Sequence, residues 1–197
     1  MERPTTLHHL KRNETSSLLK PEAHVCQLSP LQLEYLLKPL DWQRVHQDPK
    51  GFRYVKAYDV RVWLNRVFGV GGWALETLDL DCTLDVNFKH DDGSTRFNVA
   101  YRAQARLTIK APCGHVIAEF EDAAFDAKTN QTNYGDAHDN AMKSALSGAL
   151  KRCAVNLGDA FGIGLYYKDI KPDQRIVQSM IPYVGDPRIK SEEDEAA

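Results

Sequence analysis

The chain has 197 residues, of which 43% are hydrophobic and 26% charged, and its formal net charge is −2. This length suits one folded domain with tails, and the composition is that of a globular protein. No apolar run reaches the roughly 18 residues of a membrane span. The first residues also lack the apolar segment of a secretory signal.

Four cysteines are scattered along the chain and do not form the closely spaced pairs typical of zinc sites. The nearest approach to a ligand pair is Cys113 with His115, in a predicted tight turn. Free thiols in a reducing cytoplasm are the better interpretation. We therefore expect no metal and no cofactor. The cysteines are Cys26, Cys82, Cys113 and Cys153.

The small net charge hides an uneven distribution. The last twelve residues contain five acidic and two basic side chains. Global charge therefore neither indicates nor excludes a polyanionic partner, and any basic site must be local. We predict a polar, poorly ordered segment over 1–27, a folded domain over 28–180 and an acidic, disordered tail over 181–197.

A short helix is predicted near the start of the folded domain. Ser29 can cap it, Pro30 suits its first position, and Gln32 completes a capping box. Pro39 ends it. The segment 41–55 is then expected to be a loop, with a turn at its centre, that leads into a short strand.

A second helix is predicted from position 57 onward. Four apolar residues share one of its faces, and Gly69 is a natural stop. The residues of this face are Val60, Leu64, Val67 and Phe68.

Alternating apolar residues predict two long strands joined in a hairpin. Over 78–88 the apolar residues occupy even positions, and over 95–110 they occupy mainly odd positions. A two-residue turn at Asp92 and Gly93 would place Leu84 opposite Tyr101 on the apolar side.

The same register assigns structural partners to two arginines of the second strand. Arg106 would face Asp79, and Arg102 would lie diagonal to two aspartates of the first strand, so both are interpreted as cross-strand ion pairs. Arg96 has no such acidic neighbour in this register and is predicted to be available for a ligand.

The remaining elements complete an α+β pattern. A third antiparallel strand is expected over 115–125, a loop over 126–135, and a long helix capped by Asp136. The glycine-rich segment 158–172 is expected to return to the sheet. The predicted fold is an antiparallel sheet of three or more strands crossed by a long α-helix, with short flanking helices.

The long helix has two distinct faces. Lys143, Ser147 and Lys151 recur at i, i+4 spacing on one face, beside Arg152 and several small residues that would allow a phosphate backbone to approach. Basic residues near the end of a helix also suit its dipole, so a merely solvated face explains them equally well. The opposite, apolar face is predicted to cover the sheet. It contains Met142, Leu146, Ala149, Leu150, Cys153 and Leu157.

Two blocks separated by the hairpins, FRYVKAYDVRVWLNRVFGVGGW (52–73) and ALKRCAVNLGDAFGIGLYYKD (149–169), resemble the Rad-fifty-two family of single-strand annealing proteins. The resemblance implies a sheet crossed by a long helix, assembled side by side into a homo-oligomeric ring that binds single-stranded DNA in a basic outer groove. The implied function is annealing of complementary strands in homologous recombination and DNA repair, as a recombination mediator and not an enzyme.

The resemblance also implies which residues bind DNA. Lys151 and Arg152 would contact phosphates at the groove floor, with Lys143 two turns earlier. Arg44 and Tyr54 fall at further groove positions.

A second, outer DNA site is implied as well. Arg96 and Lys168 match its basic positions, and Lys128 lies in the right region at a different spacing. Val155 stands where the family has an arginine and Phe125 where it has a tyrosine, which predicts weaker or more salt-sensitive binding.

The match to an annealing domain without the family's long C-terminal half suggests a stand-alone protein of the phage or bacterial type. We then expect a cytoplasmic, nucleoid-associated location in a bacterial or phage-infected cell. The expected partners are single-stranded DNA, other copies of the chain, and a single-strand-binding protein or strand-exchange recombinase.

Two alternatives remain open at this point. Glu119, Glu121, Asp126 and Lys128 have the residue types of a magnesium-dependent DNA nuclease, in which carboxylates hold the metal near the scissile phosphate. Against it, Glu121 would also lie opposite Arg106 across the second hairpin. The other alternative is a scaffold whose acidic tail recruits a basic partner.

Overall fold

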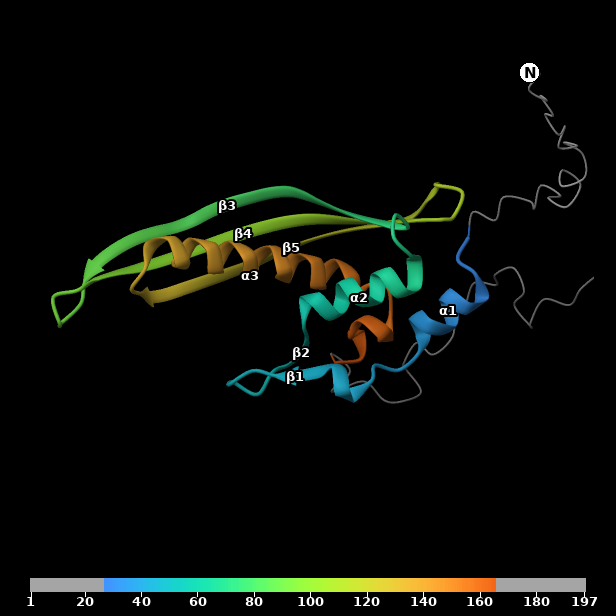
Figure 1. Ribbon diagram of the computed structural model, residues 1–197, viewed down its shortest axis with the longest axis horizontal. Helices are drawn as coiled ribbons and strands as arrows, with labels where there is room; N and C mark the ends of the chain where they lie inside the picture. The colour runs from blue at the N-terminus through green and yellow to red at the C-terminus, as the bar shows by residue number, and fades with distance from the viewer. Residues whose placement is uncertain (1–26, 166–197) are drawn as a thin grey trace, which may run out of the picture.

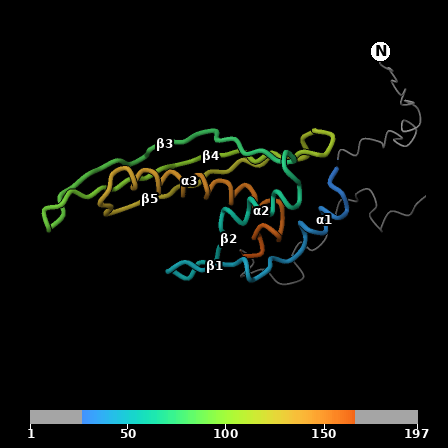
Figure 2. The backbone as a smooth tube through the Cα atoms, in the orientation of Figure 1, coloured from blue at the N-terminus to red at the C-terminus, as the bar shows by residue number. Residues whose placement is uncertain are grey.

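The computed structural model describes residues 27–165 and shows a mixed α+β fold, as predicted. Three long antiparallel strands form a sheet in the order β3-β4-β5. The long helix α3 lies along one face of this sheet, while α1, α2 and the small hairpin β1-β2 gather near one end (Figure 1). Figure 2 traces the same path from the first helix through the hairpins to α3.

Helix α1 (Pro30–Leu37) begins as its sequence predicts. The Gln32 backbone N–H donates to the Ser29 hydroxyl (3.2 Å), and the Ser29 N–H donates to the Gln32 side chain (2.9 Å). This reciprocal pair satisfies two donors that the first helical turn leaves without helical partners. Gln32 also donates to the Val67 carbonyl of α2 (2.9 Å), which joins the two helices.

The segment expected to be a loop with one strand is a hairpin. A short 3-10 helix, η1 (Trp42–Arg44), leads into β1 (Val45–Gln47), which pairs with β2 (Arg53–Val55). The Asp48 carboxylate accepts hydrogen bonds from the backbone of Lys50 (2.9 Å) and Phe52 (2.8 Å). These bonds fix the connecting turn, an arrangement that aspartate favours.

Helix α2 (Ala57–Phe68) has the predicted apolar face. Val60 and Leu64 are fully buried, and Val67 nearly so. The helix ends at Gly69, whose φ of 78° is readily adopted by glycine.

The main hairpin forms, but the predicted register is wrong. Strands β3 (Trp73–Lys89) and β4 (Thr95–Lys110) are joined by a longer turn in which the His90 N–H donates to the Ser94 carbonyl (2.9 Å) and Gly93 has a φ of 77°. This is the three-residue hairpin loop, with glycine in the left-handed region, and not the two-residue form.

Two irregularities in β3 shift the register further. They fall between Thr77 and Asp79 and between Cys82 and Leu84. Each inserts an extra residue into β3, as a β-bulge does. Leu84 lies on the turn side of both irregularities, so the longer turn alone makes it pair with Ala100 and not with Tyr101. The irregularities shift the pairing beyond Leu84, where Glu76 and not Asp79 lies opposite Arg106.

The arginines of β4 all have acidic partners; Glu121 was expected opposite Arg106 across the second hairpin, while the partners of Arg102 and Arg96 differ from the prediction. Arg106 pairs with Glu121 of β5 (2.5 Å), and Arg102 pairs with Asp79 (2.6 Å). The prediction that Arg96 has no acidic partner is wrong, because its guanidinium lies 3.2 Å from Asp92 in the turn.

Two predictions for the second half of the chain also need correction, and a third, over 158–172, lies partly outside the described residues. Strand β5 (Val116–Gln131) continues through most of the segment expected to be a loop. Helix α3 (Tyr134–Val155) is capped by Asn133, whose side chain accepts a hydrogen bond from the backbone of Asp136. The chain then forms a short 3-10 helix, η2 (Asp159–Phe161), and no strand within the described part returns it to the sheet.

Helix α3 covers β4 and β5 through small residues. Its buried stripe is mainly alanine, in place of the bulkier residues that the sequence pattern favours, and Met142 and Leu146 are half-buried. Ala145 and Ala149 pack against Ala103 and Ala105 of β4. The fully enclosed members of the stripe are Ala137, Ala141, Ala145, Ala149, Leu150, Cys153 and Ala154.

The main hydrophobic core lies where α1, α2 and η2 meet the sheet. Leu64, Leu107, Ile109, Leu150 and Phe161 belong to one buried cluster there. Beyond it, toward the turn of the main hairpin, Leu84, Val86 and Phe88 of β3 stay exposed. No helix in the described part of the chain is long and apolar enough to cross a membrane.

Candidate nucleic-acid interface

A groove of about 850 Å³ runs between the hairpin β1-β2, the start of α2, strand β5 and helix α3. Four lysines and two aspartates line it, so it carries a local excess of positive charge although the whole chain is slightly acidic. The charged residues of the groove are Lys56, Lys128, Lys143, Lys151, Asp48 and Asp126.

The predicted polar face of α3 forms one wall of this groove. Lys143, Ser147 and Lys151 all line it, together with Ser144 and Gly148. The small residues between the lysines keep the wall low, which would allow a sugar-phosphate backbone to come close to the helix.

The lack of a side chain at Gly148 also matters for the packing of α3 against the sheet. A Cβ at this position would lie 2.7 Å from the Cβ of Ala124 on β5. Such a distance is too short for two methyl groups, so the glycine permits the close approach of α3 to the sheet. This approach sets the position of the lysine face relative to the strands.

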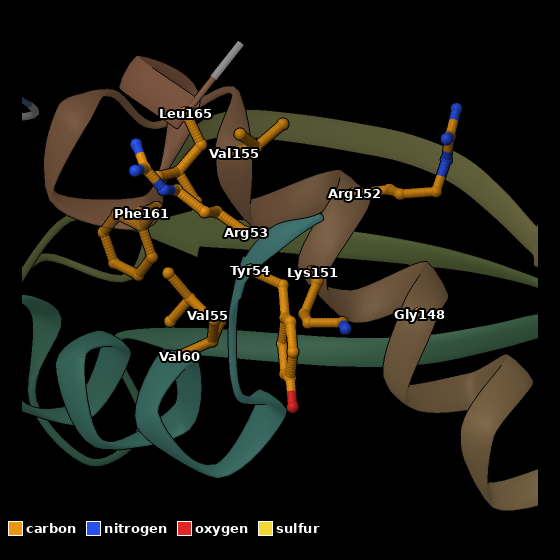
Figure 3. Close-up of a pocket in the computed structure, with 11 residues that line it drawn as sticks. Arg53, Tyr54, Val55, Val60, Gly148, Lys151, Arg152, Val155, Phe161 and Leu165 are labelled. Carbon is orange, nitrogen blue, oxygen red and sulfur yellow. The ribbon is translucent and has the colours of Figure 1, made fainter. Parts of the chain in front are cut away.

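Lys151 and Tyr54 meet at the centre of the site. The Lys151 ammonium lies 5.4 Å from the centre of the Tyr54 ring, and Figure 3 shows the two side chains next to each other. Burial lowers the pKa of Lys151, while the nearby Asp126 carboxylate acts in the opposite direction. The face of a tyrosine ring is a favourable place for a cation. Lys151 is thus a cation that has lost part of its hydration.

Two of the other groove lysines are paired with carboxylates. Lys143 is bound to Asp139 one turn earlier (2.6 Å) with 68% of its side chain exposed. Lys128 pairs with Asp126 on the same strand (2.5 Å). An exposed pair of this kind contributes little to stability, so Lys143 can exchange its carboxylate for a phosphate at small cost.

Arg152 lies beside the groove and turns away from Lys151 (Figure 3). Its guanidinium is bound to Asp122 of β5 (2.9 Å), and its side chain is more than half exposed. Arg152, Lys151 and Arg53 also line a smaller pocket of about 200 Å³ with an apolar floor that includes Phe161. The structure therefore brings Tyr54, Lys151 and Arg152 together around the end of α3.

Arg44 is not brought to the groove. Its guanidinium binds Asp59 of α2 through Nε (2.9 Å) and Nη2 (2.7 Å) and donates to the Ala160 carbonyl (2.9 Å). It also stacks on Trp63, 4.2 Å from the ring centre. Since only 11% of its side chain is exposed, Arg44 joins η1, α2 and η2 and is not available to a ligand.

Of the two residues expected at an outer site, Arg96 is the one that lies within the described part of the chain. Arg96 lies at the turn of the main hairpin, where it binds Asp92 and donates from Nε to the Ser94 hydroxyl (3.0 Å). Lys168 lies outside the described residues.

The structure divides the residues of the proposed nuclease site between the two faces of the sheet. Glu119 and Glu121 lie on the face away from α3, and Glu121 is bound to Arg106. Asp126 pairs in register with Tyr101, whose hydroxyl lies 2.9 Å from His138 of α3, so Asp126 is on the helix-covered face. Among the described residues no group of three potential metal ligands occurs, and this arrangement cannot hold one metal ion.

Three of the four cysteines lie within the described part of the chain. Cys82, Cys113 and Cys153 form no disulfide with one another, and Cys26 lies outside the described residues.

Sequence reasoning missed three side chains of the groove. Lys56, Phe52 and Tyr58 line it beside Tyr54. The sequence pattern predicts a loop in place of the hairpin β1-β2, so nothing in it places residues 48–58 opposite α3. The available signal was the sequence HQDPKGFRY, in which Asp48 and Gly51 mark a tight turn between two short runs of strand-forming residues.

Curated fungal proteins are similar to this chain. The DNA repair and recombination protein RAD52 of Eremothecium gossypii is 29% identical over 136 residues, which cover 69% of this chain and 28% of that protein. The proteins of the same name from Saccharomyces cerevisiae and Kluyveromyces lactis are each 28% identical over 116 residues, or 59% of this chain and 22% and 24% of theirs. The chain thus spans less than a third of the length of these relatives.

A family model described as "Rad52/22 family double-strand break repair protein" matches residues 30–180. The match includes the main sheet, the groove-lining hairpin and all of α3. It agrees with the resemblance carried by the two blocks that flank the main hairpins. Because it covers well over half of the sequence, the chain belongs to the Rad52/22 family.

Proposed function

We propose that this protein binds single-stranded DNA by its phosphates and anneals complementary strands in homologous recombination and DNA repair. The observation that carries the proposal is the row of Lys143, Ser147 and Lys151 along one wall of a groove in a family of double-strand break repair proteins. Lysines spaced along a helix suit a repeating phosphate chain and read no sequence.

Annealing needs no covalent chemistry from the protein. A strand held by its backbone keeps its bases away from intrastrand pairing and available to a complement. The proposed groove contacts are Tyr54, Lys143, Lys151 and Arg152. Arg44 is left out, because its guanidinium is already bound to Asp59 and to the Ala160 carbonyl.

One groove offers few phosphate contacts, so we propose that several copies act together in a ring. Linked sites convert weak single contacts into strong overall binding. The exposed apolar side chains of Leu84, Val86 and Phe88 on β3 supply a surface that another copy would cover. Head-to-tail contacts of this type close into rings when the rotation between copies permits.

Further DNA and protein contacts belong to the same proposal. Arg96 and Lys168 would form the outer DNA site, with Arg96 exchanging Asp92 for a phosphate. A single-strand-binding protein or a strand-exchange recombinase would be the protein partner. The expectation of a phage or bacterial origin remains a prediction, and the relatives described above are fungal.

The test is a charge reversal at the groove. Lys151→Glu should strongly reduce both oligonucleotide binding and the rate at which labelled complementary strands anneal. Arg61→Glu is the matched control, because Arg61 is exposed on α2, does not line the groove and gives the same change of net charge. If folded Lys151→Glu protein anneals at the wild-type rate, or if Arg61→Glu loses as much, the groove is not the DNA site.

A further inference from the structure

Three strongly exposed aromatic residues line the groove, namely Phe52, Tyr58 and Phe125. Phe125 lies four residues after Glu121 in unbroken register with β4, so its ring is on the face of the sheet away from α3, and the strongly exposed rings on the α3 side are those of Phe52 and Tyr58. Phe52 is 62% exposed and Tyr58 is 63% exposed, and both line the groove that contains the lysines. Rings that remain this open to water contribute little buried apolar area to the fold. When such rings alternate with cations they match the alternation of bases and phosphates in a single strand.

The backbone of Phe52 is fixed in place before any ligand arrives. Its N–H donates to the Asp48 carboxylate (2.8 Å), and its carbonyl accepts from the Asp48 N–H (2.9 Å). Phe52 stands two residues before Tyr54 along extended backbone, so both side chains point to the same side of the hairpin. That side meets Lys151 of α3. Because the backbone is already ordered, only the side-chain torsions of Phe52 lose freedom when its ring binds.

Tyr58 occupies the first turn of α2, four residues after Tyr54 in the sequence. The Lys56 ammonium lies 5.8 Å from the centre of its ring. Lys56 can therefore contact a phosphate while the adjacent ring contacts a base. Tyr54 itself is less suited to this role, because it is only partly exposed and two side chains, those of Lys151 and His46, lie near its ring.

We propose that Phe52 and Tyr58 stack on unpaired bases of the strand whose phosphates the lysines hold. This inference rests on the proposed function and names additional binding residues for it. The bases of a duplex are paired and stacked on one another, so the two rings favour single strands over duplex. They also give the affinity a component that depends on bases and is insensitive to salt.

The experiment compares two oligonucleotides of equal length, one of thymidines and one of abasic sites, with the full chain. Wild type should bind the thymidine strand at least about fivefold more tightly per stacked ring, because aromatic stacking has that magnitude. The double variant Phe52→Leu with Tyr58→Leu keeps apolar side chains but removes the rings. It should bind both strands with the same affinity and keep the wild-type salt dependence.

Trp42→Leu is the matched control. Trp42 is equally exposed at 65% and lies next to Arg53, but it does not line the groove. This variant should keep the preference for the thymidine strand. The aromatic inference is overturned if Trp42→Leu loses that preference as completely as the double variant.

Other outcomes separate this inference from the proposed function. Wild type that binds both strands equally well overturns the stacking inference and leaves the proposed function standing. Wild type that binds neither strand overturns both. If the double variant instead loses its oligomeric state in light scattering, a second copy covers the rings, and the stacking inference is wrong.

Discussion

At the scale of single residues, Lys151 combines a charge with a partly dehydrated position. Burial lowers its pKa from the ordinary lysine value of 10.5, with Asp126 opposing the shift. The free protein therefore loses this charge at a lower pH than the ordinary lysine pKa would give. A phosphate in the groove would favour the charged form, so binding and protonation of Lys151 are coupled.

This coupling gives a prediction for pH. As pH rises through the lowered pKa, the complex must take up a proton at Lys151, and DNA affinity should fall before pH 10.5 is reached. Lys151→Arg keeps its charge throughout and should move the fall to higher pH. Titrations of oligonucleotide affinity against pH would measure this. Identical pH profiles for wild type and Lys151→Arg would contradict it.

Arg44 is the opposite case, a cation fully used by the fold. Removing it leaves the Asp59 carboxylate, only 17% exposed, without its main partner. Arg44→Leu should therefore lower the free energy of unfolding by about 3 kcal/mol. Denaturant unfolding would measure the loss. The salt dependence of DNA binding by the folded variant should be unchanged, and a shallower dependence would show that Arg44 contacts phosphate after all.

At the scale of elements, the contact between α3 and β5 depends on two small residues. Gly148→Ala would gain about 1 kcal/mol in helix propensity. The added methyl would lie 2.7 Å from the Ala124 Cβ, however, and forcing the helix outward costs about 1–3 kcal/mol. We expect net destabilisation, measured by thermal or denaturant unfolding.

A second substitution isolates the steric cause. Adding Ala124→Gly to Gly148→Ala removes the opposing methyl, and the double variant should recover a large part of the lost stability. Ser144→Ala on the same helix is the control, since Ser144 lines the groove and a smaller side chain there meets no strand. A double variant as unstable as the sum of the two single variants would contradict the steric explanation.

The elements differ in how far sequence could predict them. Helix α1 was predictable because Ser29 and Gln32 form a local cap that needs no tertiary context. The register of β3 and β4 was not, because bulges depend on how the sheet twists over α3 and leave no clear trace in the pattern. The buried alanine stripe of α3 was not predictable either, because a search for hydrophobic periodicity favours large apolar residues over alanine.

The candidate site was also predictable only in part, because spacing along one helix is visible in the sequence and contacts between distant segments are not. Lys143, Ser147 and Lys151 share a helix face by spacing alone, and in the structure all three line one groove. The partners of Arg44 and the position of the aromatic rings at the groove could not be predicted without knowing which distant segments meet. Position 44 follows the family pattern in sequence, but the carboxylate that binds it comes from α2 and the carbonyl from η2.

At the scale of the whole molecule, the proposed assembly can be separated from the proposed groove. Val86→Asp places a charge in the exposed apolar strip of β3, which does not line the groove, and should reduce the oligomer by light scattering. Binding to long oligonucleotides should weaken because the sites of several copies no longer act together. Binding to oligonucleotides short enough for one groove should stay the same.

The control for that prediction is the salt dependence. The slope of log affinity against log salt should become shallower by about 0.7 for each phosphate that is no longer bound, so Val86→Asp should flatten it for long strands alone. Asn87→Asp introduces the same charge on the neighbouring position, which points to the other face, and should leave assembly intact. An unaltered oligomer in Val86→Asp would contradict the proposed surface.

The two bulges in β3 have a consequence of another kind. Strand β3 forms an open border of the sheet described here and is 17 residues long, a length at which an uninterrupted strand is a template for uncontrolled fibril growth. Each extra residue bends the strand and breaks the regular row of donors and acceptors that an incoming chain would need. The same insertions that obscure the pairing pattern thus guard a long, partly apolar ribbon against aggregation.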